Sequence, residues 1–99
     1  MAYDYLAPLR DMRFVIERVL DAPASWAACP VFADVDLDTA GAVMEEAARF
    51  AREVLLPTNA PGDREGCTLQ AVGVKTPAGY RAAYRAFVDA FRAGVIRLR

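Results

Sequence analysis

The chain has 99 residues and no histidine, and this absence excludes several classes of chemistry at once. Without an imidazole there is no Ser-His-Asp or Cys-His arrangement that activates a nucleophile. Most zinc sites also use histidine as a ligand, so a zinc centre is not expected. A small single-domain enzyme of these types is therefore not indicated by the sequence.

Cysteine is scarce, and long apolar runs are missing. Cys29 and Cys67 lie far apart without Cys-x-x-Cys spacing, so we expect two reduced thiols, with a disulfide as the lesser alternative. No run reaches the roughly 18 apolar residues that a membrane helix needs. Residues 1–5 have neither the positive region nor the apolar region of a secretion signal. We therefore expect a cytoplasmic protein with no membrane partner.

Alanine is abundant: 56% of the residues are hydrophobic, and 20 residues are alanine. Alanine is the best helix former and adds little volume to a core. This composition predicts a mainly α-helical fold with close contacts between helices. Whether the helices bury one another or need a missing neighbour stays open at this point.

Charge is unevenly distributed, although the net charge is only −1. Residues 1–74 carry six basic and twelve acidic side chains, whereas residues 75–99 carry six basic and one acidic. An anionic partner such as nucleic acid is one interpretation, and the solvated face of an amphipathic helix is the other. Because no basic cluster is interleaved with aromatic residues, we favour the helix face and expect no nucleic-acid partner.

Three segments have the apolar periodicity of amphipathic helices. The first is predicted to begin with Pro8 as its first helical residue and to end before Pro23. The second follows an acidic run that supplies its N-cap, and is predicted to end at Pro57. The third is predicted to begin at Thr76-Pro77, with the threonine as N-cap. The predicted apolar stripe of the first helix is Met12, Val15, Ile16, Val19 and Leu20. The stripe of the second helix is Ala40, Val43, Met44, Ala47, Ala51, Val54 and Leu55. The stripe of the third helix, which is expected to be buried, is Tyr80, Tyr84, Phe87, Val88 and Phe91, and Gly94 is its predicted C-cap.

The connecting segments are rich in proline and glycine. Residues 22–35 are predicted to form an ordered loop that Trp26 and Phe32 anchor. Residues 57–66 are predicted to form a loop rich in turn-forming residues. Residues 68–70 and 72–75 are predicted to form two very short strands around a turn.

Paired carboxylates are the first candidate for chemistry, because adjacent acidic residues can act as general acid and base. Glu45 and Glu46 are such a pair, but both are predicted to lie on the polar face of the second helix. Arg49 follows them at spacings of four and three residues, so we expect both to form exposed ion pairs with it.

Aromatic residues and glycines supply the other candidates. Trp26, Tyr80 and Tyr84 are each interpreted as packing residues rather than as ligand contacts. Residues 62–66 contain two glycines, but a phosphate-binding loop requires a preceding strand, and a helix precedes here. No catalytic, cofactor-binding or metal-ligating residue is therefore predicted.

Six blocks, in a fixed order, resemble one known family. The first block is residues 7–15, Ala-Pro-Leu-Arg-Asp-Met-Arg-Phe-Val. The others are residues 45–51 (EEAARFA), 54–59 (VLLPTN), 62–67 (GDREGC), 76–80 (TPAGY) and 83–88 (AYRAFV). No block is specific alone, but together they resemble the N-terminal segment of a subgroup of flavin-dependent acyl-CoA dehydrogenases, over roughly residues 3 to 88.

The resemblance implies a domain division. Residues 1–88 correspond to part of the larger helical N-terminal domain of that family, and residues 89–99 form a divergent basic tail. In the family a step like Gly-Gly-Trp follows this helix, whereas here the tail stands in its place. We expect such a tail from a frameshift or an early stop.

The resemblance also implies a function for the intact family. Acyl-CoA dehydrogenases form an α,β double bond in an acyl-CoA thioester: a glutamate removes the α proton, and FAD accepts the β hydride. The flavin lies on a middle β domain and the base in a C-terminal helical domain, so neither is expected in this chain. We expect the chain alone to be inactive and to bind neither FAD nor acyl-CoA tightly, and the electron-transfer partner to belong to the intact enzyme.

A different class of function is also compatible with the residues. A standalone helical interaction module would use the same apolar stripes to bind a second copy or another protein. Such a module is expected to unfold cooperatively as a defined monomer or oligomer, whereas a piece of a larger enzyme is expected to expose apolar surface.

Overall fold

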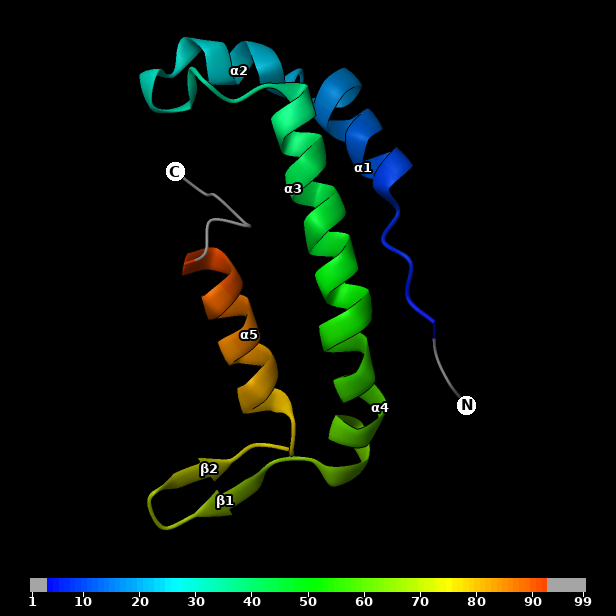
Figure 1. Cartoon of the computed structure of the whole chain (residues 1–99), viewed down its shortest axis with the longest axis vertical. Coiled ribbons are helices and arrows are strands. Elements are labelled where there is room, and N and C mark those ends of the chain that lie inside the picture. Colours follow the sequence, from blue (N-terminus) through cyan, green and yellow to red (C-terminus); the bar gives the residue numbers. More distant parts are fainter. Residues whose placement is uncertain (1–3, 93–99) are drawn as a thin grey trace.

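One long helical rod organises the structure, a computed structural model that describes residues 4–92 (Figure 1). The rod is built from three consecutive elements, and shorter helices lie on its two sides. The fold is mainly α-helical, as predicted. The rod comprises α3 (Leu37–Phe50), the π-helical η3 (Ala51–Leu55) and α4 (Leu56–Glu65); α1 (Leu9–Phe14) with the π-helical η1 (Val15–Val19) lies on one side, and α5 (Tyr80–Arg92) on the other.

The first helix begins at Leu9, and Pro8 is its N-cap rather than its first helical residue. The helical path ends where Asp21 takes a left-handed conformation, with φ of 45°. Aspartate is one of the few non-glycine residues that adopt this conformation routinely. The chain can therefore turn sharply between η1 and the next helix.

The loop predicted for residues 22–35 was wrong over most of its length. It contains α2 (Ala22–Ala28) and a 3-10 helix, η2 (Pro30–Phe32). Pro23 and Pro30 both lie in the first turn of their helices. A proline there loses no helical hydrogen bond, because the first N–H groups have no partner in the helix. The prolines thus start short helices instead of preventing them.

The N-terminus of α3 is capped as the acidic run predicts. Asp36 precedes the helix in an extended conformation, and its Oδ1 accepts a hydrogen bond of 2.7 Å from the N–H of Thr39. This bond satisfies one of the helix N–H groups that have no partner within the helix.

The prediction that Pro57 ends the second helix was wrong, and so was the loop predicted for residues 57–66. The helix continues through α4 as far as Glu65. Pro57 lies in the first turn of α4, directly after the change to π-helical geometry in η3, where its missing N–H is tolerated. Gly66, with φ of 66°, ends the helix, and its N–H bonds to the carbonyl of Gly62.

The predicted hairpin is present. β1 (Thr68–Gln70) pairs antiparallel with β2 (Gly73–Lys75), and Leu69 lies opposite Val74. Both strands are exposed along their whole length. The hairpin therefore reverses the chain without adding to the core.

The third helix begins at Tyr80, three residues later than a start at Pro77 would place it. Gly79 has φ of 93°, which is not helical. Residues 78–79 therefore form a turn, and α5 begins only after it. Glu65 Oε2 accepts a hydrogen bond of 3.0 Å from the N–H of Ala78, which ties this turn to the end of α4. The predicted C-cap, Gly94, lies outside the described residues. Since α5 continues past residue 88, the predicted division at that point has no counterpart in the helix and stays a prediction.

The core is very small. Phe50 of α3 and Phe87 of α5 meet edge to face, with ring centroids 5.9 Å apart. Within residues 4–92, the buried apolar side chains are Phe50, Ala83 and Pro77. The stripe on α5, predicted to be buried, is therefore largely uncovered: Tyr84 is 68% exposed and Phe91 42%.

The dimensions of the chain agree with its small core. Its radius of gyration is 17.2 Å, whereas a compact domain of this length has about 13 Å. Its accessible surface is 7948 Å², whereas a compact protein of 10.8 kDa exposes roughly 5500 Å². The predicted amphipathic helices are present, but much of their apolar surface has no neighbour within residues 4–92.

Replacing the cap of α3 tests the first turn of the rod. We expect Asp36→Ala to lower the Tm by a few degrees at neutral pH, because the N–H of Thr39 loses its acceptor. The hydrogen bond from Thr39 lowers the pKa of Asp36 below its ordinary value. The stabilisation is therefore present above about pH 4 and lost as the pH falls through the lowered pKa.

Thermal unfolding followed by circular dichroism at several pH values measures this difference. Asp34→Ala is the matched control, because it removes the same charge without this hydrogen bond. A difference between wild type and Asp36→Ala that persists unchanged in strong acid would contradict the capping role.

Candidate functional site

Several concave surfaces lie along the rod, and two of them contain the candidate residues. The first, which we call the apolar groove, lies between the rod and α5 and encloses about 350 Å³. Most of its lining is aliphatic or aromatic, and Thr58 adds a hydroxyl that donates to the carbonyl of Leu55 at 2.7 Å. The lining residues are Phe50, Leu55, Thr58, Tyr80, Ala83, Tyr84 and Phe87.

Gly62 allows the two walls of the apolar groove to approach. It is buried in α4, and a Cβ at this position would lie 2.6 Å from Cε1 and 2.7 Å from Cζ of Tyr80. Sequence reasoning placed Gly62 in a loop and missed this role. The available signal was a glycine within a helical segment, which often marks close packing.

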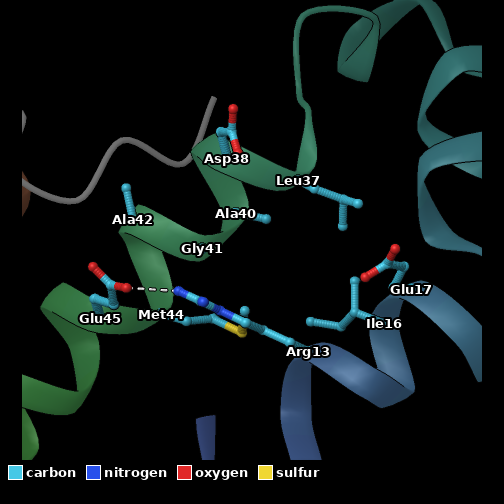
Figure 2. A pocket seen from close by; sticks show the side chains of 10 residues that line it. All are labelled: Arg13, Ile16, Glu17, Leu37, Asp38, Ala40, Gly41, Ala42, Met44 and Glu45. Atoms are coloured by element: carbon cyan, nitrogen blue, oxygen red, sulfur yellow. Dashed lines mark hydrogen bonds and ion pairs between the residues drawn. The ribbon is translucent and has the colours of Figure 1, made fainter. Parts of the chain in front are cut away.

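The second surface, which we call the Arg13 groove, lies between α3 and the first helix (Figure 2). It encloses about 440 Å³, and Arg13 reaches across it to Glu45, with Nη2 2.6 Å from Oε1. Ile16 and Leu37 contribute apolar side chains, while the lining also includes two further carboxylates, Glu17 and Asp38. The surface is therefore amphipathic, with more negative than positive charges.

The Arg13–Glu45 ion pair joins the first helix to α3. The two side chains are 49% and 62% exposed, so the pair is worth at most about 1 kcal/mol. Gly41 lies directly beneath the guanidinium, since a Cβ there would be 3.2 Å from Nη2 of Arg13. The interaction positions the helices more than it stabilises them.

The adjacent carboxylates, Glu45 and Glu46, point to different partners. The predicted pair of Glu46 with Arg49 is confirmed, whereas the predicted pair of Glu45 with Arg49 was wrong. Arg49 instead bonds Glu53, with Nη1 2.7 Å from Oε2. Glu45 pairs with Arg13 because the first helix lies along α3, a contact that spacing within one helix cannot reveal.

The electrostatics of this cluster oppose acid–base catalysis. The hydrogen bond from Arg49 lowers the pKa of Glu46. The hydrogen bonds with Glu46 and Glu53 in turn raise the pKa of Arg49. A general acid near neutral pH needs a carboxyl pKa that is raised, not lowered. Glu46 is therefore held as a carboxylate in an ion pair.

The remaining candidate residues are dispersed. Tyr80 and Tyr84 both line the apolar groove, whereas Trp26 is half-buried on α2 and lines neither groove. Cys29 is half-buried and Cys67 exposed, and both are free thiols, as predicted. Within residues 4–92, no three potential metal ligands gather, and no helix is long and apolar enough to cross a membrane.

Comparison with known proteins gives one informative match. No sequence-family profile matches the chain. A 3-methylmercaptopropionyl-CoA dehydrogenase of Ruegeria pomeroyi is 40% identical to it over 85 residues. This chain is similar to an acyl-CoA dehydrogenase. The match covers 86% of this chain but only 14% of that protein, so it supports the acyl-CoA dehydrogenase family while spanning a small part of the relative's length.

The linings of these two grooves do not fit the FAD that acyl-CoA dehydrogenases use. A flavin dinucleotide carries a pyrophosphate, which proteins bind with cations or with the N–H groups of a helix N-terminus. The lining of the apolar groove contains no cation. The Arg13 groove has one cation, already paired with Glu45, and two further carboxylates that would repel phosphate.

A pair of glycine substitutions tests the close approach of α4 and α5. We expect Gly62→Ala to lower the free energy of unfolding by about 1–3 kcal/mol, because the new methyl group overlaps the ring of Tyr80. Urea unfolding followed by circular dichroism measures the loss.

Gly41→Ala is the matched control, since it adds the same methyl group to another buried helical glycine. The atoms it meets belong to the flexible end of Arg13, and alanine gains up to about 1 kcal/mol of helix propensity over glycine. We expect no loss of stability for Gly41→Ala. Equal losses for the two variants would show that the Gly62–Tyr80 contact is not tight.

Proposed function

We propose that this chain is the N-terminal helical region of a flavin-dependent acyl-CoA dehydrogenase, and that it is inactive by itself. The observation that carries the proposal is the very small core, with many large apolar side chains exposed. It occurs in a chain that is 40% identical, over 85 residues, to a much longer dehydrogenase. An amphipathic helix must bury its apolar stripe against another element to form a stable layer. Within residues 4–92, much of the stripe of α5 and of the stripe of the first helix lacks that element.

The amount of uncovered surface supports this role. The chain exposes 7948 Å², roughly 2400 Å² more than a compact protein of its mass. Interfaces between domains of one chain bury about 600–1500 Å². The surplus is therefore large enough for contacts with more than one neighbouring domain of the enzyme.

The role that follows is structural support. In this proposal the general base and the flavin site, and with them the proton and hydride transfers, belong to other domains of the intact enzyme. The helices of this region would pack against the domains that form the acyl pocket. Binding of acyl-CoA and of an electron-transfer partner, and a cytoplasmic location, are attributed to that intact enzyme.

A standalone interaction module is the second candidate, because the same exposed stripes serve either role. The two differ in self-sufficiency. A module would unfold cooperatively and have no affinity for a dehydrogenase, whereas a structural region would bind the enzyme body that lacks it.

Reconstitution in trans tests the proposal. The experiment uses the Ruegeria pomeroyi enzyme with its 85 matching residues deleted, mixed with this chain. We expect co-elution on gel filtration and a gain of dehydrogenase activity with the CoA thioester that gives that enzyme its name. In parallel, this chain alone is incubated with FAD and desalted, and we expect no visible flavin absorption.

A variant pair makes the reconstitution specific. Tyr84→Ser removes an aromatic ring from the apolar groove. We expect it to raise the Kd of this chain for the deleted enzyme at least tenfold, so that less of the chain co-elutes. Leu69→Ser, on the exposed hairpin, is the control and is expected to behave as wild type. A stoichiometric yellow complex of this chain alone, or a cooperatively folded chain that ignores the deleted enzyme, would overturn the proposal.

A further inference from the structure

The apolar stripe of α5 is wider than the part of it that the rod covers. At about 3.6 residues per turn, Ala83 and the stripe fall within less than half of the helix circumference. Ala83, on the edge nearest the rod, is 7% exposed, whereas Tyr84, further round the helix, is 68% exposed. The missing cover therefore lies on the side of Tyr84, over the mouth of the apolar groove. From the rod outward, the order round the helix is Ala83, Phe87, Tyr80, Phe91, Tyr84 and Val88.

This surface is suited to contact with an identical surface, because its centre is neutral. Among the described residues, those that line the apolar groove or form the stripe of α5 are all uncharged. The charged side chains of α5 lie outside the stripe, on the part of the helix that is turned away from the rod; they are Arg81, Arg85, Asp89 and Arg92. Two copies can therefore bring their grooves together without placing like charges in the middle of the contact.

A twofold axis parallel to α5 brings two such surfaces together. Rotation about this axis leaves each residue at its height along the helix, so α5 stays level with the apolar groove of the other copy. It then lies between the rod and the α5 of that copy, and the same contact forms twice. The result is a four-helix bundle in which each α5 contacts two rods that run antiparallel to it (Figure 1). The first helix lies on the other side of the rod and leaves the groove open (Figure 1).

We propose that this chain, when separated from the rest of the enzyme, forms a twofold dimer in which α5 of each copy fills the apolar groove of the other. The uncovered area is sufficient, since the surplus of roughly 2400 Å² per chain exceeds the about 800 Å² that each partner buries in a standard interface. The occupant is a second copy because the chain supplies both the groove and an apolar helix that fits it. The inference goes beyond the proposed function. It implies that dimerisation and binding of the enzyme body exclude one another, since both use the apolar groove.

Sedimentation velocity of the full chain tests the dimer. We expect a discrete dimer, and we expect Tyr84→Ser to raise its Kd at least tenfold, because the ring at the mouth of the groove is lost. Leu69→Ser removes an exposed apolar side chain from the hairpin instead, and is expected to leave the Kd unchanged. Circular dichroism checks that each variant keeps its helix content. A monomeric wild type, an open-ended aggregate, or equal effects of the two substitutions would overturn the proposal.

Cross-linking tests the direction of the two α5 helices. In a Cys29→Ser/Cys67→Ser background, Phe91→Cys places a single thiol on the stripe, and Asp89→Cys places one on the opposite side of the helix. An axis parallel to α5 sets position 91 of one copy level with position 91 of the other. We therefore expect a short bis-maleimide reagent to cross-link the Phe91→Cys variant at least tenfold faster than the Asp89→Cys variant. Equal rates, including no cross-linking of either variant, would show that this arrangement is wrong.

Adding the deleted Ruegeria pomeroyi enzyme separates this inference from the proposed function. If both are correct, the dimer dissociates as the enzyme body takes the groove, and dehydrogenase activity appears. A chain that is monomeric alone but reconstitutes the enzyme overturns the dimer and leaves the proposed function intact. A chain that dimerises as described but does not reconstitute the enzyme supports the dimer and overturns the proposed function.

Discussion

The edge-to-face contact of Phe50 with Phe87 is the interaction on which the tertiary structure depends. It is the main aromatic contact between α5 and the rod, and it is completed by the buried Ala83 and by the approach of Tyr80 to Gly62. The attachment of the first helix to α3 includes an exposed ion pair of small energetic value. A single aromatic pair thus defines the relative positions of segments nearly forty residues apart.

Features that depend on neighbours in sequence were predictable. The cap at Asp36, the hairpin of β1 and β2 and the pairing of Glu46 with Arg49 involve groups within a few residues of one another. The continuation through Pro57 was not predictable, because a proline ends or joins a helix according to the geometry of the preceding turn. The partner of Glu45 also depended on a contact between helices that are remote in sequence.

In the candidate site, too, local features were predictable from the sequence and tertiary contacts were not. Periodicity correctly marked the apolar face of α5, including Tyr80 and Tyr84, but it does not say what covers that face. The sequence therefore led us to expect burial where the structure has an open groove. The role of Gly62 also needed the fold, since it becomes essential only when Tyr80 lies against it. The matched relative is about six times as long as this chain, and in the proposed function the missing cover belongs to the rest of that enzyme.

The prolines of the rod have a mechanical consequence. Pro57 and Pro61 each lack the N–H that would bond one turn back, so the helix ladder has two gaps within a few residues. Helices bend most readily at prolines, and these two lie near the point where the hairpin and α5 are attached (Figure 1). We therefore expect α4 to bend more readily than α3, while the contact of Phe87 with Phe50 keeps α5 beside the end of α3.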